Sequence, residues 1–389
     1  MRITRKTTLL LLAAAVAVFA AGCGKQAPDA TPETPPAAEA APVPAESITL
    51  AATGVAPDET VAVVDGNSAP AELLTYQIGY SCNYLDYMLA AYGQDGLDLS
   101  GTLPDGRNTA DYVREESLAM VKQQLVLENL AERYGITLSD EEEAELARQR
   151  EADIEEYGED GYRAELYRLG LSEDSYTRVM RVGYFYQALL DAYADPASPI
   201  YASDEQLAAY AEEQGYITAD HILIPTVDLD TQEPLSDEDA AANRALAADL
   251  LAQLRESDDP ITLFKTLADE YSKDSGRAAN PDGYTFAEGR MVDEFDAAAR
   301  ALDEYAISDV VESVYGCHII LRKPLDTAAA AEAVRGEAFD RFFLDEVDKA
   351  EMELSPAAER FDVAAVYDAI VAARGSETAD GAQENPFAP

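Results

Sequence analysis

Two apolar runs, ITADHILIP (Ile217–Pro225) and YGCHIILRK (Tyr315–Lys323), decide how the second half of this chain folds. Each run is short and largely apolar around its histidine, which is typical of a buried strand. Each run also carries one histidine, His221 or His318, and the 389-residue chain has only these two. The segment between the histidines has the length of one small α+β domain, so we expect both strands to belong to a single domain.

Three helices are predicted between the two strands. The first is SDEDAAANRALAADLLAQLRES (236–257), in which Ser236 and Asp239 stand at the positions of a capping box. The second is ITLFKTLADEYS (261–272), and the third is VDEFDAAARALDE (292–304). Residues 273–290 are predicted to be a loop, and SDVVESV (308–314) to be the strand before the last one. The expected order is β-α-α-α-β-β, with a small antiparallel sheet, over residues 214–324.

Helical patterns flank this domain on both sides. Residues 59–213 open with a strand-like run, TVAVVDG (60–66), and continue as amphipathic helices, one of which starts with a capping box at Ser139 and Glu142. Residues 325–373 are helical again, and residues 374–389 are expected to be a disordered tail. The sequence therefore predicts an α+β domain inserted between two mostly helical regions.

Residues 1–22 are predicted to be a signal peptide. Its positive residues are Arg2, Arg5 and Lys6, and the apolar run Leu9–Phe19 that follows is too short to span a membrane comfortably. The segment leads into AAGC, which resembles a bacterial lipobox with Ala20 where Leu is commoner. The resemblance implies cleavage before Cys23 and lipidation of its thiol, which would anchor the chain at the extracytoplasmic face of a bacterial membrane. The alternative is a plain secretory signal followed by an incidental cysteine.

A tether is predicted after the lipidated cysteine. Residues 23–58 are rich in Pro, Ala and Glu and show no apolar periodicity. This composition is typical of a disordered, rather stiff linker. Extended at about 3 Å per residue, it could hold the folded part up to roughly 100 Å from the membrane.

The chain is strongly acidic. It has 75 Asp and Glu against 28 Lys and Arg, a formal net charge of −47. This balance argues against nucleic acid as a partner, because phosphate contacts need clustered Lys and Arg. We interpret the charge as a solvated surface. The acidic stretch DLDTQEPLSDED (Asp228–Asp239) has Glu233 where a calcium loop has its turn glycine, and it is expected to be an acidic loop.

No metal site and no cofactor are expected. Two histidines without further matched ligands are too few to hold a metal ion. Cys82 and Cys317 lie in apolar contexts and are interpreted as buried free thiols, while a disulfide between them stays open.

Five pieces of sequence, in order, resemble the parvulin (PpiC-like) family of peptidyl-prolyl isomerases. They are ADHILI (219–224), FKTLADEYSKDSG (264–276), GRMVDEF (289–295), ISDVVES (307–313) and YGCHIILRK (315–323). The flanking regions are similar to the extracytoplasmic foldases of the PrsA and SurA type. These carry a helical chaperone domain before the parvulin domain, and in the PrsA type a final helix packs back on it. The PrsA type also implies a lipid anchor.

The parvulin resemblance implies a set of site residues. In the parvulin fold the first and last strands lie side by side, so His221 and His318 are expected to meet and to share a hydrogen bond as neutral rings. The implied catalytic residues are His221, Asp274 and His318, and the implied substrate-binding residues are Phe286, Met291, Phe295 and Tyr315. Each assignment has a structural alternative. The histidines could only tie two strands together, Asp274 could be a turn residue at a helix end, and Met291 and Phe295 could be ordinary core.

The sequence departs from the family at NPDGYTF (Asn280–Phe286), where GGDLGWF is common. Gly283 then stands where a pocket Leu is expected, and Cys317 replaces a common Tyr. Loss of the Leu would remove apolar wall from the pocket, so we expect weaker prolyl binding or a reshaped loop.

The resemblance implies a noncovalent peptidyl-prolyl cis-trans isomerase that acts on exported, partly unfolded polypeptides with X-Pro bonds. The alternative is a holding chaperone whose parvulin module is weak or inactive. A solute-binding lipoprotein ranks below both, because it needs alternating β-α-β lobes and residues 68–213 are helical. The client proteins, the residue preferred before proline and the oligomeric state, a homodimer included, stay open.

Overall fold

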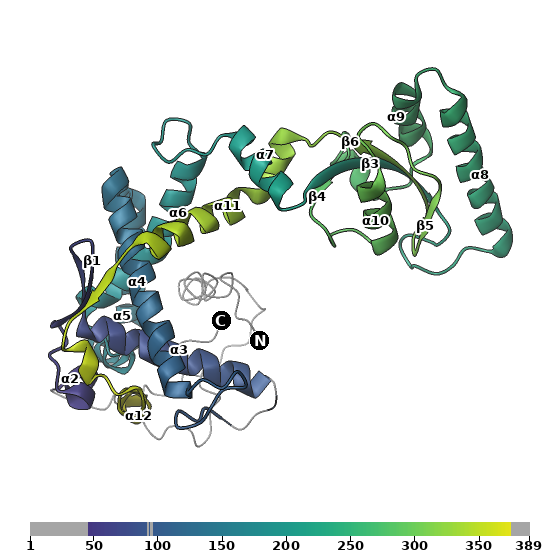
Figure 1. Ribbon diagram of the computed structural model, residues 1–389. Coiled ribbons are helices and arrows are strands. Elements are labelled where there is room, and N and C mark those ends of the chain that lie inside the picture. Colours follow the sequence, from purple (N-terminus) through teal and green to yellow (C-terminus); the bar gives the residue numbers. More distant parts are fainter. Residues whose placement is uncertain (1–45, 92, 94–95, 375–389) are drawn as a thin grey trace. The chain divides into compact units, whose positions relative to one another are not determined.

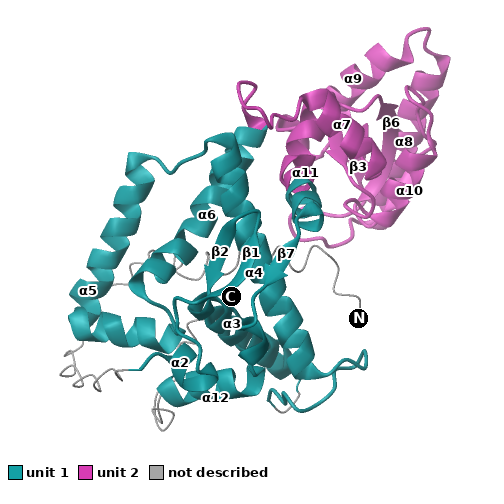
Figure 2. Ribbon diagram, turned by 60° about the vertical axis from the view of Figure 1, so that its left-hand side comes forward, with its two compact units in different colours: residues 1–193, 340–389 teal, residues 194–339 magenta. Residues whose placement is uncertain are grey.

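The computed structural model describes residues 46–91, 93 and 96–374. It has two compact units, one of residues 1–193 and 340–389 and one of residues 194–339 (Figures 1 and 2). The predicted signal peptide, Cys23, most of the tether and the tail after residue 374 lie outside the described residues. The predicted α+β class is confirmed, since helices dominate and the unit with the histidines holds a small antiparallel sheet.

Both histidine strands lie at the centre of a four-stranded antiparallel sheet of order β4-β3-β6-β5. They are β3 (Ile217–Pro225) and β6 (Gly316–Lys323), flanked by β4 (Tyr284–Phe286) and β5 (Val311–Ser313). The other elements are α8 (Asp237–Glu256), α9 (Pro260–Tyr271), the 3-10 turn η1 (Ser275–Ala278) and α10 (Asp293–Ala301). The expected pairing of the first and last strands is confirmed, from Thr218 opposite Lys323 to Pro225 opposite Gly316.

One element was missed in the predicted order. Strand β4 lies in the stretch predicted as a loop, so the order is β-α-α-β-α-β-β rather than β-α-α-α-β-β. The strand has three residues and follows Pro-Asp-Gly, a combination that favours a turn. It is stabilised by pairing with β3, where Tyr284 lies opposite Ala219, and a partner so distant in sequence leaves no local signal.

Alternation along β3 and β6 sends their side chains to two faces of the sheet. One face packs against α8 and α9 in a cluster that includes Ile222, Ile224, Phe264 and Ile319. The other face packs against α10 in a cluster that includes Ala219, Phe295 and Ile320. His221 and His318 are two residues from Ala219 and Ile320 respectively, so both histidines lie on the α10 face.

Gly283 occupies the turn before β4. Its φ is 97°, in the left-handed region that favours glycine. A Cβ at this position would lie 2.7 Å from the carbonyl oxygen of Ala219 in β3. The glycine that stands in place of the expected Leu therefore allows the turn to approach the β3 backbone closely.

Gly283→Ala is expected to destabilise the second unit by about 2–4 kcal/mol, because backbone strain and a clash with β3 add together. Gly289→Ala is the matched control, since its φ is 75° but nothing lies within 4 Å of the added Cβ. Only the conformational cost of about 1–2 kcal/mol remains there. Hydrogen exchange of the β3 amides in the full chain measures both losses, and equal losses would contradict the steric reason.

The first unit is mostly helical and contains a three-stranded antiparallel sheet of order β2-β1-β7. Its elements are α2 (Ile48–Thr53), β1 (Thr60–Val64), β2 (Asn67–Pro70), α3 (Ala71–Ala91), α4 (Thr109–Tyr134), α5 (Asp140–Leu169), α6 (Glu173–Ala194), β7 (Met352–Leu354), η2 (Ala358–Arg360) and α12 (Val363–Arg374). Helix α12 packs on α2 and α3, and Ile370 fits against Gly79, where a Cβ would lie 2.8 Å from its Cδ1 atom. No helix among the described residues is both long and apolar enough to cross a membrane.

The chain divides into its two units at 193/194 and 339/340, whereas the predicted domain boundaries are 213/214 and 324/325. Helix α7 (Asp204–Glu213) falls in the second unit, where Arg335 of α11 (Thr327–Lys349) lies 3.4 Å from Asp204. Helix α11 begins in the second unit and ends in the first. Helix α7 and the first part of α11, which were predicted to belong to the flanking helical regions, therefore belong to the second unit.

The tether prediction is wrong for its last part. Ser47 caps α2 by accepting a hydrogen bond from the Leu50 amide, and Ile48 and Val55 are buried. The helix has only 6 residues, which is too short to show an apolar periodicity in the sequence. Its stability comes from packing against α12, which is more than 300 residues later in the chain.

Candidate active site

The two histidines form a stacked pair on the α10 face of the sheet. His221 lies opposite Ile320 and His318 opposite Leu223, so the two rings are diagonal neighbours across the central strands. Their Nδ1 atoms are 3.0 Å apart, and the ring planes differ by 10°. Both residues are buried, which fixes the geometry of the pair.

Asp274 joins the pair at the His221 end. It lies between α9 and η1, where its side chain accepts a hydrogen bond from the Gly276 amide and so caps η1. Its Oδ2 atom is 3.1 Å from His221 Nε2 and accepts a hydrogen bond from the Tyr284 hydroxyl at 2.5 Å. At the opposite end, Ser313 Oγ lies 2.7 Å from His318 Nε2.

With both rings neutral, these contacts allow one consistent assignment of protons. An ionised Asp274 only accepts hydrogen bonds, so His221 must carry its proton on Nε2. A neutral His221 then accepts at Nδ1, and His318 donates from its own Nδ1. His318 Nε2 is left as an acceptor for the Ser313 hydroxyl. The result is a hydrogen-bond chain in one direction, from Ser313 through both rings to Asp274.

Burial and neighbouring charges support this assignment. Burial, and next the adjacent His221, lower the pKa of His318 to about 4, so the ring is neutral at pH 7. Burial acts to raise the pKa of Asp274, but hydrogen bonds from His221 and Tyr284 outweigh it and hold that pKa at about 2. Asp274 is therefore a carboxylate across the physiological range.

The low pKa of His318 predicts a loss of stability in acid. The unfolded chain takes up a proton at the ordinary pKa of 6.5, whereas the folded chain resists protonation until about pH 4. This contribution is fully present above pH 6.5, and about 2–3 kcal/mol of unfolding free energy is lost as the pH falls to 4. His318→Asn removes the titrating ring and is the reference. Denaturant unfolding of both proteins at pH 7 and pH 4 measures the difference, and parallel pH profiles would contradict it.

An apolar cluster lies beside the two rings. Phe295 of α10 presents its ring at 5.1 Å from His221 and 5.5 Å from His318, nearly perpendicular to both. Phe286 of β4 lies 5.9 Å from Phe295, and Met291 is a partly buried member of the same cluster. Three of the four residues expected to bind substrate are thus brought together in one apolar cluster, and Phe295 joins this cluster to His221.

Tyr315 is placed differently. It lies in the turn between β5 and β6, where its amide donates to Ser313 Oγ at 3.2 Å and its carbonyl oxygen accepts from the Thr226 amide. It is not among the described residues that form the apolar cluster of Phe286 and Phe295. The structure therefore places Tyr315 on the His318 side of the site, through its backbone contact with Ser313.

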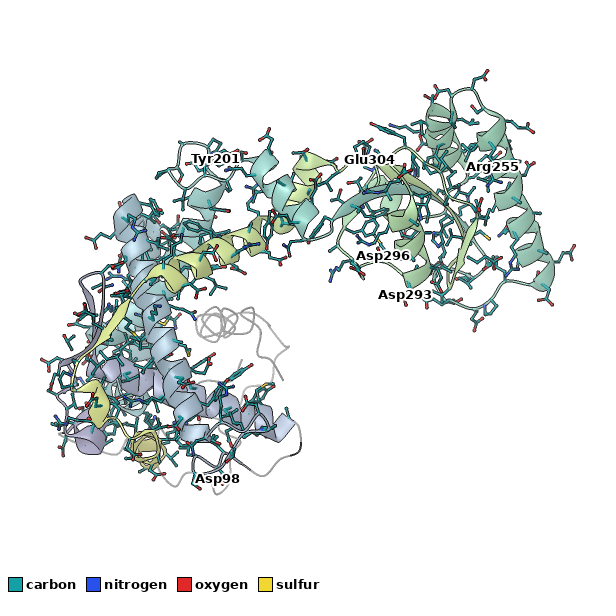
Figure 3. All side chains as sticks on the ribbon, in the orientation of Figure 1. Asp98, Tyr201, Arg255, Asp293, Asp296 and Glu304 are labelled. Atoms are coloured by element: carbon teal, nitrogen blue, oxygen red, sulfur yellow. The ribbon has the colours of Figure 1, made fainter. Side chains whose placement is uncertain are left out.

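The segment that carries Met291 is held by α10. Asp296, labelled in Figure 3, accepts a hydrogen bond from the Gly289 amide at 2.7 Å and from Arg300 Nε at 2.7 Å. Met291 itself precedes α10, which begins at Asp293. It lies in the turn that Asp296 and Gly289 hold against the start of this helix.

A paired cation lies next to the site. Asp220 Oδ1 accepts the backbone N–H of His221 and the Arg277 Nη1, both at 2.7 Å. Arg277 also contacts Asp269 at 2.8 Å. Burial raises the pKa of Asp220 although Arg277 acts in the opposite direction. This pair holds the β3 backbone at His221 and leaves the guanidinium engaged by two carboxylates.

Sequence reasoning missed Tyr284, Ser313 and Arg277. Tyr284 stands in NPDGYTF, the segment that departs most from the family pattern, and that departure was the available signal. Ser313 stands in the strand before His318, where alternation places it near the ring only once the β5–β6 pairing is known. Cys82 and Cys317 are free and buried, as interpreted from the sequence. Among the described residues, no group of three or more His, Cys, Asp or Glu is arranged to hold a metal ion.

Comparison with known proteins places this site in a recognised domain. The family model for the rotamase, PPIC-type PPIASE domain matches residues 221–323, which contain His221, Asp274 and His318. The foldase protein PrsA of Oceanobacillus iheyensis is 38% identical over 96 residues, 23% of this chain and 32% of that protein. The chaperone SurA of Methylococcus capsulatus is 34% identical over 131 residues, 33% of this chain and 26% of that protein.

A solved structure is also similar. The crystal structure of PrsA from Bacillus subtilis matches over 74% of this chain and 95% of that chain, at 22% identity and a TM-score of 0.24. The aligned part of this chain spans about a third or less of the length of the two curated relatives above.

Proposed function

We propose that this chain, whose residues 221–323 form a PPIC-type PPIase domain, is a peptidyl-prolyl cis-trans isomerase that assists the folding of exported polypeptides. The observation that carries the proposal is the hydrogen-bond chain Asp274–His221–His318 beside the Phe295 ring. A polar row next to an apolar cluster suits an X-Pro segment, whose ring is apolar and whose amide is polar.

The proposed mechanism is noncovalent. The barrier to rotation about an X-Pro bond is about 20 kcal/mol and no bond has to break, so the enzyme gains by binding the twisted amide better than either planar isomer. Met291, Phe295 and Phe286 would seat the proline ring. The histidine pair and the Asp274 carboxylate would set the polarity around the amide, whose nitrogen becomes more basic when conjugation is lost.

The remaining parts of the chain fit a foldase with a surface anchor. Lipidation of Cys23 would hold the chain at the extracytoplasmic face of a bacterial membrane, with the residues before Ser47 as the tether. The helical regions on either side of the PPIase domain would bind unfolded clients, and the packing of α12 on α2 and α3 supports one chaperone domain built from both ends of the chain. The relatives named foldase and chaperone support the same role.

The test is the isomerisation rate of a set of X-Pro peptides with the full chain, measured by NMR exchange. We expect acceleration in proportion to enzyme concentration. A chain that fails on every peptide but suppresses aggregation of an unfolded protein would be a holding chaperone. The structure weakens that alternative, because Gly283 faces the β3 backbone and Tyr284 joins Asp274, so the altered NPDGYTF segment supports the site.

A further inference from the structure

Tyr284 occupies a position from which it reaches the site across the sheet edge. It lies opposite Ala219 on β4, and His221 is two residues further along β3 on the same face. The Tyr284 ring therefore stands beside the His221 ring, with centroids 5.8 Å apart and planes at 82°. Its hydroxyl extends to Asp274 Oδ2, the same oxygen that receives His221 Nε2.

Gly276 leaves the room that this hydroxyl needs. A Cβ on Gly276 would lie 2.2 Å from the Tyr284 oxygen and 3.3 Å from Cζ of the same ring. The Gly276 amide donates to the other Asp274 oxygen, Oδ1, at 3.1 Å. A side chain at position 276 would displace Tyr284 from Asp274 without changing either of the two residues.

We propose that Tyr284 is a positioning residue of the proposed isomerase. Its hydroxyl holds the Asp274 carboxylate in place as the acceptor at the end of the hydrogen-bond chain. With Tyr284 and His221 on Oδ2 and the Gly276 amide on Oδ1, the carboxylate has three donors and a fixed orientation. The inference rests on the function proposed above, and it assigns a role to a residue that departs from the usual PPIC-type pattern.

The hydroxyl also opposes protonation of Asp274. It donates to the ionised form, and it is the second hydrogen bond, after that of His221, that keeps the pKa of this carboxyl at about 2 against burial. A protonated Asp274 would donate to His221 and reverse the chain. The titratable groups that face Asp274 are His221 from β3, Tyr284 from β4 and His318 from β6, and the nearby Asp220 and Arg277 are paired with each other.

Two measurements on the full chain test this role. In the first, ¹³C NMR follows the Asp274 carboxyl in the wild type and in Tyr284→Phe, and we expect the titration midpoint to rise by about one pH unit in the variant. In the second, kcat for peptide isomerisation at pH 7 is expected to fall about tenfold with KM unchanged, because the loss concerns the polar chain and not the apolar cluster. Tyr305→Phe is the control, since that side chain is 59% exposed, and it is expected to change neither value.

Gly276→Ala gives an independent variant with Tyr284 intact. It should reproduce both effects, and in a Tyr284→Phe background it should add little, because Gly276 acts through the hydroxyl. An unchanged carboxyl midpoint, or an unchanged kcat, in both single variants of an active enzyme would overturn the inference. A wild-type chain without isomerase activity would refute the proposed function instead, and the carboxyl titration would still decide whether Tyr284 holds Asp274.

Discussion

His221→Ala is expected to lower kcat/KM for prolyl isomerisation about 100-fold, the order of loss found when one preorganised polar group is removed from an active site. His221 is the centre of the polar row, bonded to Asp274 through Nε2 and to His318 through Nδ1. Without the ring, the row is cut into two halves. Asp274 then keeps only the donors from Tyr284 and Gly276, and no hydrogen-bond chain connects it to His318.

His221→Gln is the matched variant for this prediction. A glutamine amide can reach the position of Nε2 and donate to Asp274, but it cannot also accept from His318. We expect it to retain more activity than alanine and less than histidine. The free energy of unfolding is measured for both variants, so that loss of the folded domain is separated from loss of activity. If His221→Ala keeps its fold and its kcat/KM stays within threefold of the wild type, the histidines tie the strands together and have no catalytic role.

The two strands could be predicted from the sequence because their signal is local, whereas the meeting of the two histidines was expected only from the parvulin resemblance. Each of the two runs reads as a buried strand, and alternation within each run fixes which residues share a face. The register between β3 and β6 could not be predicted from the sequence. His221 and His318 meet because Ile320 lies opposite His221, and a shift of one residue would have sent one of the rings to the α8 face.

The residues that were missed depend on partners remote in the sequence. Tyr284 reaches Asp274 only because β4 pairs with β3 and Gly276 leaves space, and neither condition shows in NPDGYTF itself. Gly283 is a similar case. By comparison with the family pattern, Gly283 replaces a leucine of the pocket. Its φ and its close approach to Ala219 indicate instead that the turn requires glycine at this position. Helix α2 has no local signal for the same reason, since it packs against α12 from the other end of the chain.

Phe295→Ala is expected to cost the second unit about 3–5 kcal/mol of stability and to remove most of the isomerase activity. The ring is 3% exposed, and it lies within 6 Å, centroid to centroid, of His221, His318 and Phe286. Its removal leaves a cavity between the apolar cluster and the hydrogen-bond chain of Asp274, His221 and His318. Hydrogen exchange measures the loss at the β3 and β6 amides, and the amides of α3 and α4 in the other unit are the internal reference.

Phe295→Leu separates the two roles that Phe295 could have. Leucine fills most of the volume, so we expect a stability loss of only about 1–2 kcal/mol and a domain that stays folded. It lacks the flat ring that stands perpendicular to both histidines, and a proline ring would lose that wall of its pocket. For an active-site residue, KM for X-Pro peptides therefore rises severalfold in a folded protein. If Phe295→Leu loses activity only at temperatures where the second unit unfolds, Phe295 is ordinary core and the proline ring binds elsewhere. A raised KM in the stable protein, together with a similar rise for Met291→Ala, would place the ring between these two side chains.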